Sequence, residues 1–191
     1  MENKKRIFVT GITGNQGSAV TRHLLDKGYE IVGLTRDKNS DKAQHWKNQG
    51  VTIVEGNLND TSTYQAVMNE TDAIYFVQSL QKKNSEIQQG RQFIDAIRSS
   101  DSKHLVYASV VGADLKTGIP HFDSKYEIEK HIISSNINYT ILRPASFYEN
   151  YLIPQVANSI RKGKFVSPLN KSCKQQLIGV DDIGKITAQV I

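Results

Sequence analysis

Three glycines, Gly11, Gly14 and Gly17, lie between an apolar run at residues 7–9 and a helix-like run at residues 18–27. The first glycine suits a tight turn, the second lets a ligand approach the backbone, and the third lets a helix pack closely on a strand. Backbone N–H groups at the start of such a helix attract an anion. In this strand–loop–helix context, the pattern predicts a pyrophosphate site for a dinucleotide, formed by Gly11, Ile12, Thr13, Gly14, Asn15, Gln16 and Gly17.

The residues after the second apolar run indicate which dinucleotide is bound. A carboxylate at the end of that strand would accept from the ribose 2′-hydroxyl of NAD(H) and repel a 2′-phosphate. Here Thr35 ends the run and Arg36 follows it. A guanidinium can bind a phosphate through two N–H groups and stack on adenine. We therefore predict NADP(H) as the cofactor; the alternative for Arg36 is a solvated loop charge, and the neighbouring Asp37 complicates the assignment.

Strand-like and helix-like segments alternate along most of the chain. Apolar, strand-like runs occur at residues 7–9, 31–35, 51–54, 73–77, 104–108 and 139–143, and helix-like segments separate them at 18–27, 41–48, 60–68 and 85–99. Near-continuous apolar strands between helices indicate a parallel sheet that is covered on both faces. Right-handed crossovers then produce a doubly wound sheet. The predicted fold class is α/β, with the glycine loop at the end of the first strand.

The composition of the chain indicates which kinds of partner are not expected. The chain has 191 residues and a formal net charge of +5, but its Lys and Arg residues are scattered, so no nucleic-acid partner is expected. No apolar run approaches the length of a membrane span, and the first residues lack the apolar stretch of a signal peptide. The single cysteine, Cys173, cannot form an internal disulfide. We expect a cytoplasmic protein that has no membrane partner.

Taken together, these motifs resemble the NmrA-like family of atypical short-chain dehydrogenases/reductases. Besides the glycine loop, the resemblance rests on residues 34–36, 55–60, 89–90, 105–113, 120–125, 139–144 and 147–150. It implies an NADP-binding Rossmann domain at residues 1–150 and a small carboxyl-terminal lobe that shapes a substrate cleft. Residues 180–184 resemble a segment that family members follow with much more chain. The lobe at residues 151–191 is therefore expected to be truncated.

The resemblance also implies further cofactor contacts. Asn57 and Leu58 correspond to positions that contact adenine; Asp is usual at the first, but the amide oxygen of Asn57 can still accept a hydrogen bond. Gln78 and Ser79 follow the fourth strand and would edge the cofactor. Beside the nicotinamide, the expected contacts are Phe147, Tyr148 and Asn150.

The wider superfamily implies a catalytic helix on which Tyr and Lys are four residues apart. Two pairs here have that spacing, His121 with Lys125 and Tyr126 with Lys130. They lie about 140° apart around a helix, so both pairs cannot face the cofactor.

The surrounding sequence favours the first pair. Ser124, Lys125 and Glu129 match the superfamily pattern Ser-Lys-x-x-x-Glu. Lys125 then takes the place of the lysine that binds the nicotinamide ribose, and His121 takes the place of the tyrosine. Ser109 lies at the superfamily's serine position; the alternative is a strand-end hydroxyl that bonds local backbone.

The absence of a tyrosine at position 121 shapes the expected activity. Nicotinamide supplies the hydride, and quinone reduction needs little help from a protein acid because protons can come from solvent or His121. We predict an NADP(H)-binding oxidoreductase that acts on a small molecule, with quinones or related carbonyls as candidates. The alternative is a non-catalytic sensor of NADPH and NADP⁺ that acts through a regulatory protein partner. An epimerase-like enzyme is a weaker third reading, since it would need the tyrosine.

Overall fold

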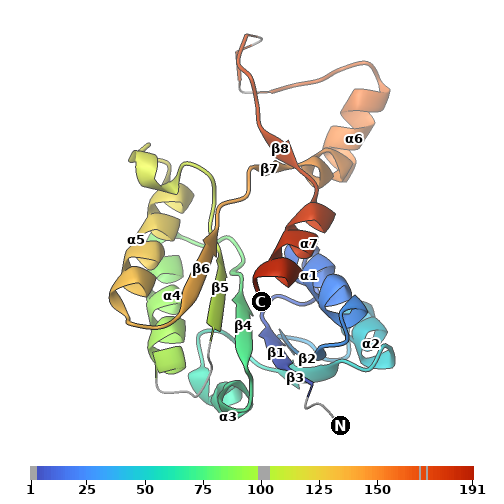
Figure 1. Cartoon of the computed structure of the whole chain (residues 1–191). Coiled ribbons are helices and arrows are strands. Elements are labelled where there is room, and N and C mark those ends of the chain that lie inside the picture. Colours follow the sequence, from blue (N-terminus) through green and yellow to red (C-terminus); the bar gives the residue numbers. More distant parts are fainter. Residues whose placement is uncertain (1–3, 99–103, 168, 171) are drawn as a thin grey trace.

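A six-stranded parallel sheet forms the body of the molecule (Figure 1). The computed structural model describes residues 4–98, 104–167, 169–170 and 172–191. The strands are β1 (Arg6–Val9), β2 (Glu30–Thr35), β3 (Thr52–Glu55), β4 (Ala73–Phe76), β5 (His104–Ala108) and β6 (Tyr139–Leu142). Their spatial order is β3-β2-β1-β4-β5-β6, which confirms the predicted doubly wound α/β fold. The order reverses between β1 and β4, and ligands of such sheets bind at the carboxyl ends of the strands at that point.

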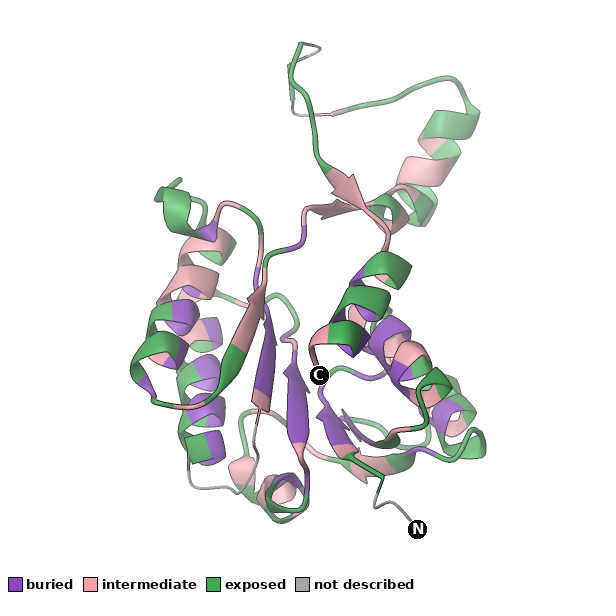
Figure 2. Ribbon diagram, viewed as in Figure 1, coloured by how far each residue is buried: buried purple, intermediate pink, exposed green. Residues whose placement is uncertain are grey.

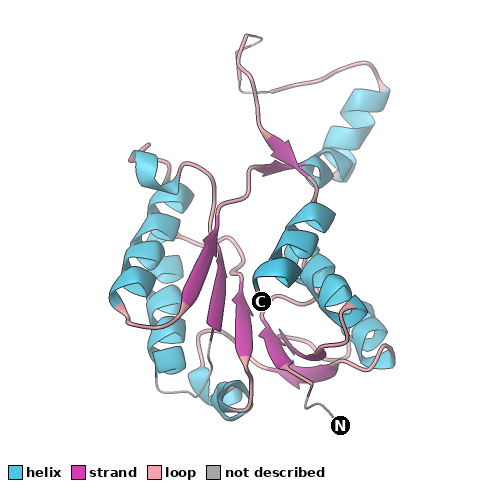
Figure 3. Cartoon of the chain, in the orientation of Figure 1, coloured by secondary structure: helices cyan, strands magenta, loops and turns pink. Residues whose placement is uncertain are grey.

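Helices cover both faces of the sheet (Figure 3). One face carries α1 (Asn15–Asp26), α2 (Asp41–Asn48) and α7 (Val180–Val190), and the other carries α3 (Gln65–Asn69), α4 (Lys83–Arg98) and α5 (Pro120–Ser134). The helix expected over residues 60–68 is divided into a 3₁₀ turn, η1 (Thr61–Thr63), and α3. Asp60 caps η1 by accepting from the backbone N–H of Ser62. The expected end of α4 at residue 99 lies outside the described residues.

Buried apolar side chains form one layer on each side of the sheet. The ribbon of Figure 2 marks buried residues in purple along the central strands and on the helices that flank them. Phe8 of β1 faces α4, where its ring stacks with that of Phe93. Its neighbours Ile7 and Val9 face the opposite layer, which includes Trp46 of α2. None of the three β1 side chains has exposed surface. Burial on both faces explains why the strands read as continuous apolar runs in the sequence.

A small lobe extends beyond the carboxyl ends of the strands (Figure 1). It consists of β7 (Ser146–Phe147), the 3₁₀ helix η3 (Tyr148–Leu152), α6 (Pro154–Arg161) and β8 (Leu177–Ile178), and β7 pairs with β8 in parallel. None of the residues in these four elements is buried. The lobe therefore lacks a core of its own within the described residues.

The chain returns from the lobe to the sheet through α7, which packs against α1. Gly184 permits this close approach, because a Cβ there would lie 2.6 Å from the carbonyl oxygen of Ala19. Asp181 Oδ1 lies 2.9 Å from His23 Nε2, and the Lys27 ammonium donates to the carbonyl of Ala188. Residues 151–191, expected to form the lobe, thus include a helix that packs with the sheet domain. No helix in the described part of the chain is long and apolar enough to cross a bilayer.

Candidate functional site

A cleft of about 730 Å³ opens at the carboxyl ends of β1 to β4, next to the reversal of strand order. Its size is typical of a small-molecule site. The loops after these four strands form its walls, together with α4 and the lobe strand β7. Most of the residues predicted to contact a cofactor line it: Gly11, Thr13, Gly14, Asn15, Gln16, Gly17, Arg36, Asn57, Leu58, Gln78, Ser79 and Phe147.

Four predicted cofactor contacts lie outside the cleft lining: Lys125, which is described with α5 below, and Ile12, Tyr148 and Asn150. The side chain of Ile12 is fully buried and fills the space above Gly33 in the core. Tyr148 and Asn150 are exposed on η3, at the base of the lobe. Only the first residue of the expected group at the nicotinamide end, Phe147, lines the cleft.

The glycine loop has the tight geometry that its sequence predicts. Gly11 has a φ of +61°, and its carbonyl accepts from the N–H of Gly14 at 2.9 Å. A Cβ on Gly17 would lie 2.2 Å from the Gly11 carbonyl oxygen, so only glycine lets α1 start this close to the loop. No side chain caps the start of α1, and its first turn holds no acidic residue. The backbone N–H groups at the start of α1 are therefore free of side-chain caps, and together with the positive end of the helix dipole they suit an anion.

The loop after β2 places an available cation at the edge of the cleft. Arg36 is exposed, and among the described residues it has no carboxylate within ion-pair distance. The neighbouring Lys38 is already paired with Glu55 at 3.1 Å. Asp37 is engaged within its own loop, where it accepts from the N–H of Asn39 at 2.8 Å. The arrangement leaves the Arg36 guanidinium able to meet a phosphate.

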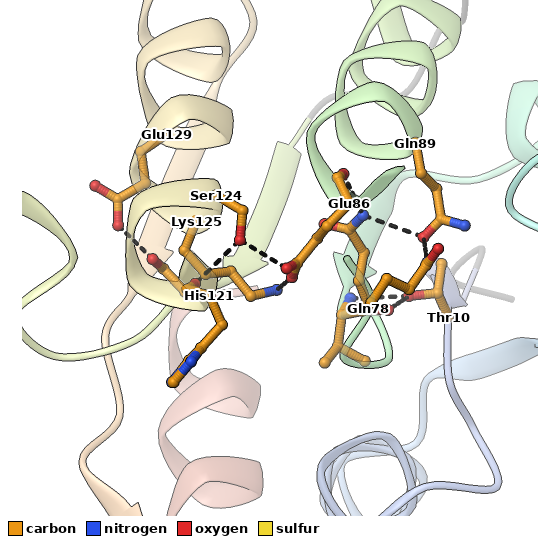
Figure 4. Close-up of polar contacts among 11 residues, drawn as sticks. Thr10, Gln78, Glu86, Gln89, His121, Ser124, Lys125 and Glu129 are labelled. Carbon is orange, nitrogen blue, oxygen red and sulfur yellow. Dashed lines mark hydrogen bonds and ion pairs between the residues drawn. The ribbon is translucent and has the colours of Figure 1, made fainter. Parts of the chain in front are cut away.

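Four amide side chains form a connected wall on the opposite side of the cleft. Gln89 of α4 donates to Asn59 at 2.7 Å and accepts from Gln81 at 2.8 Å and from Gln78 at 3.1 Å. Figure 4 shows Gln78 and Gln89 meeting beside the end of β1. Sequence analysis assigned no role to Asn59, Gln81 or Gln89. The available signal was the position of Gln89 on the face of α4 that packs into the core.

A buried ion pair lies behind this wall, between α4 and α5 (Figure 4). Lys125 Nζ is 3.0 Å from Oε1 of Glu86, and the Ser124 hydroxyl donates to Oε2 of the same carboxylate at 2.7 Å. Glu86 has no exposed surface. Burial lowers the pKa of the Lys125 ammonium, and the negative charge of Glu86 raises it in part. Sequence analysis missed Glu86, although its spacing from Gln89 and Phe93 places it on the buried stripe of α4.

Ser109 belongs to a second buried cluster. Its hydroxyl donates to Glu129 of α5, which is itself fully buried. Arg143 donates to both carboxylate oxygens of Glu129, at 3.0 and 2.6 Å, and to Asp114 at 2.7 Å. The serine hydroxyl is therefore engaged by a side chain on α5 instead of by local backbone, and it does not line the cleft.

The two candidate pairs on α5 differ in their surroundings. Lys125 keeps 12% of its side-chain surface exposed, whereas Lys130 keeps 50%, pairs with Glu127 and lies over the ring of Tyr126. His121 is exposed at the start of the helix, and neither it nor Lys125 lines the cleft. The two lysines therefore differ in burial, and the choice of Lys125 as the ribose contact stays a prediction.

The reversed strand order, the glycine loop and the cleft beyond it define a Rossmann domain of the dinucleotide-binding class. More specifically, the chain belongs to the NmrA-like family, whose model matches residues 3–191. Both findings confirm the resemblance drawn from the sequence motifs.

The chain is similar to individual curated proteins and solved structures over much of its length. The chain is 27% identical over 192 residues to photosystem II assembly factor Ycf39 of Synechocystis, covering 97% of this chain and 58% of that protein. It is 28% identical over 162 residues to quinone oxidoreductase 2 of Escherichia coli, covering 84% and 55%. A crystal structure of that NADPH-dependent quinone oxidoreductase, complexed with NADPH, superposes with a TM-score of 0.84 at 26% identity, covering 97% and 64%. The chain thus spans well under two thirds of either curated relative.

Proposed function

We propose that the chain binds NADP(H) in the cleft. The observation that carries this proposal is the glycine loop, which closes tightly under an uncapped helix start at the carboxyl end of β1. The pyrophosphate would lie against the start of α1 and the 2′-phosphate against Arg36. Asn57 and Leu58 would edge the adenine, with Gln78 and Ser79 farther along the cofactor. The NADPH complex of the E. coli relative supports this assignment.

We propose further that the chain is part of an NADPH-dependent oxidoreductase that reduces quinones or related carbonyls. Bound NADPH would supply a hydride, and one proton from solvent would complete reduction of a quinone to a hydroquinone. No buried protein acid is then needed, which suits a site where the Ser109 hydroxyl is engaged by Glu129. His121 is exposed to solvent at the start of α5. The lobe after residue 150 would begin the substrate-binding part, with Phe147, Tyr148 and Asn150 at its base.

Steady-state NADPH oxidation with a panel of quinones tests this proposal. We expect oxidation that depends on the quinone and saturates with it, with one hydroquinone formed for each NADPH consumed. NADPH binding without oxidation by any quinone would instead support the non-catalytic sensor that acts through a protein partner. Failure to bind NADPH at all would contradict both functions.

Replacing Arg36 by alanine should weaken NADPH binding about tenfold or more, since losing a partly exposed charge-assisted contact costs about 1.5–3 kcal/mol. NADH lacks the 2′-phosphate, so its affinity should stay within about twofold of the parent. Titration of both cofactors under one salt condition measures the difference. Lys38→Ala is the matched control, because this neighbouring cation is already paired with Glu55 and should change little. Equal losses for both cofactors in Arg36→Ala would remove the phosphate role.

A further inference from the structure

The ion pair between Lys125 and Glu86 is unusual in how completely the carboxylate is enclosed. Glu86 has no exposed surface and lies in the first turns of α4, facing α5 (Figure 4). An unpaired charge in such a place would be strongly destabilising, so each partner requires the other. The pair joins the two helices directly behind the amide wall of the cleft.

Glu86 is the carboxylate whose negative charge favours the protonated form of Lys125. Of the other groups around the lysine, Tyr107 of β5 lies with its ring centroid 5.3 Å from Nζ, and burial together with nearby carboxylates holds its pKa well above the usual range. Glu129 is bound by Arg143, and Asp123 is paired with Lys83 at 2.9 Å. Among the described residues, only Glu86 lies within ion-pair distance of the Lys125 ammonium.

Hydrogen bonds fix the position of Glu86 from both sides. Gln78, which lines the cleft, donates from its amide to the backbone carbonyl of Glu86 at 3.0 Å. Ser124 donates to one carboxylate oxygen and leaves the other to face Lys125. The Lys125 ammonium itself has no well-aligned hydrogen-bond acceptor in the described structure. Apart from the ion pair with Glu86, the N–H groups of this ammonium have no hydrogen-bond partner among the described residues.

We propose that Glu86 is a positioning residue for dinucleotide binding. Its carboxylate favours the protonated form of Lys125 and holds the ammonium next to Gln78 and the amide wall, outside the cleft lining. When the cofactor binds, the flexible lysine side chain would turn toward the cleft to meet the ribose hydroxyls. The inference rests on the proposed function, in which NADP(H) occupies the cleft and Lys125 binds the nicotinamide ribose. It adds a requirement for one buried carboxylate on α4, which acts only through the lysine.

The test is the pH dependence of NADPH affinity in Glu86→Gln. Glutamine keeps the size of the side chain and can still accept from Ser124, but it removes the negative charge. Without that charge burial dominates, so Lys125 should lose its proton at a lower pH than in the parent. Its contribution to binding is present below the pKa of Lys125 and is lost as the pH rises through it. As the pH is raised, we therefore expect the affinity of the variant to fall at a lower pH than that of the parent, so that the midpoint of its binding profile is shifted to lower pH.

Three further variants separate this role from a structural one. Lys125→Met and the double variant Glu86→Gln/Lys125→Met should bind weakly and share one pH profile, because the titrating lysine is gone. Glu86→Asp keeps the charge and should retain the parent profile. Asp123→Asn removes the more exposed pair between the same helices and should leave the profile unchanged. Thermal unfolding of each variant checks that it is folded under the titration conditions.

The outcomes are distinct. A parent protein that does not bind NADPH at any pH contradicts the proposed function itself. A parent that binds, with a Glu86→Gln variant that is equally weakened at every pH, overturns the inference and assigns Glu86 a purely structural role. Normal binding in Lys125→Met also overturns it. If Glu86→Gln does not fold, the comparison of Glu86→Asp with Lys125→Met decides, since the inference requires the parent pH profile in the first and weak binding in the second.

Discussion

Replacing Gly17 by alanine should reduce NADPH affinity by about a hundredfold or more. This is the largest loss of binding that we expect from any of the substitutions considered. The added Cβ would lie 2.2 Å from the carbonyl oxygen and 2.6 Å from the carbonyl carbon of Gly11. Both are backbone atoms, so relief requires the loop and the start of α1 to move apart. A hundredfold loss corresponds to about 2.7 kcal/mol, which is reasonable when the displaced N–H groups are the ones that bind the pyrophosphate. Cofactor titration measures the loss.

Gly28→Ala is the matched control for this prediction. Gly28 has a φ of +81° but open space where a Cβ would lie, and it follows the far end of α1. Alanine there should cost about 1–2 kcal/mol of stability from backbone strain and leave NADPH affinity unchanged. If Gly17→Ala binds NADPH normally, or loses no more affinity than Gly28→Ala, the pyrophosphate does not lie against this loop.

Replacing Arg143 by methionine should lower the free energy of unfolding by about 2–3 kcal/mol, because it leaves the fully buried Glu129 carboxylate without its partly exposed counter-charge. Glu129 has no exposed surface and would lose two of its three donors, retaining only the Ser109 hydroxyl. Denaturant unfolding at neutral pH measures the loss.

The control for Arg143→Met is Asp114→Asn, which removes the exposed partner of the same guanidinium. The pKa of Asp114 is lowered chiefly by its hydrogen bond with Arg143, and this carboxylate is solvated. Exposed ion pairs contribute little to stability, so the control should change the free energy of unfolding only slightly. An Arg143→Met variant as stable as Asp114→Asn would show that Glu129 does not depend on its pair.

Local pattern was sufficient to predict the fold and the glycine loop. Strands that are buried on both faces appear in the sequence as continuous apolar runs. The tight loop after β1 requires glycine at particular positions, so its glycines appear at a fixed spacing. The expected helix at residues 41–48 matches α2, and the expected strand at 104–108 matches β5. Where a local signal is ambiguous, as at residues 60–68, a short 3₁₀ turn and a separate helix replace the single helix.

The pairings within the site could not be predicted in the same way. Glu86 meets Ser124 across 38 positions, and Ser109 meets Glu129 across 20. Such contacts depend on how α4 and α5 rotate against each other, which a single sequence does not reveal. Glu86 could have been suspected from its place on a buried stripe, but a polar residue in a polar helix gives a weak signal. The packing of α7 on α1 could not be predicted for the same reason, because its contacts join residues about 160 positions apart.

The lobe leaves the sheet and returns to it through a narrow neck. Phe147 pairs with Ile178, and both carboxylate oxygens of Glu149 accept from the N–H of Val180 at the start of α7, at 3.1 and 3.2 Å. The intervening excursion, residues 150–177, is therefore closed at its base. The entropy of closing a loop rises by only about 0.6 kcal/mol for each doubling of its length. Insertions and deletions within the excursion should consequently leave the dinucleotide cleft intact. The length and sequence of residues 150–177 can therefore vary between relatives while the residues of the neck are kept.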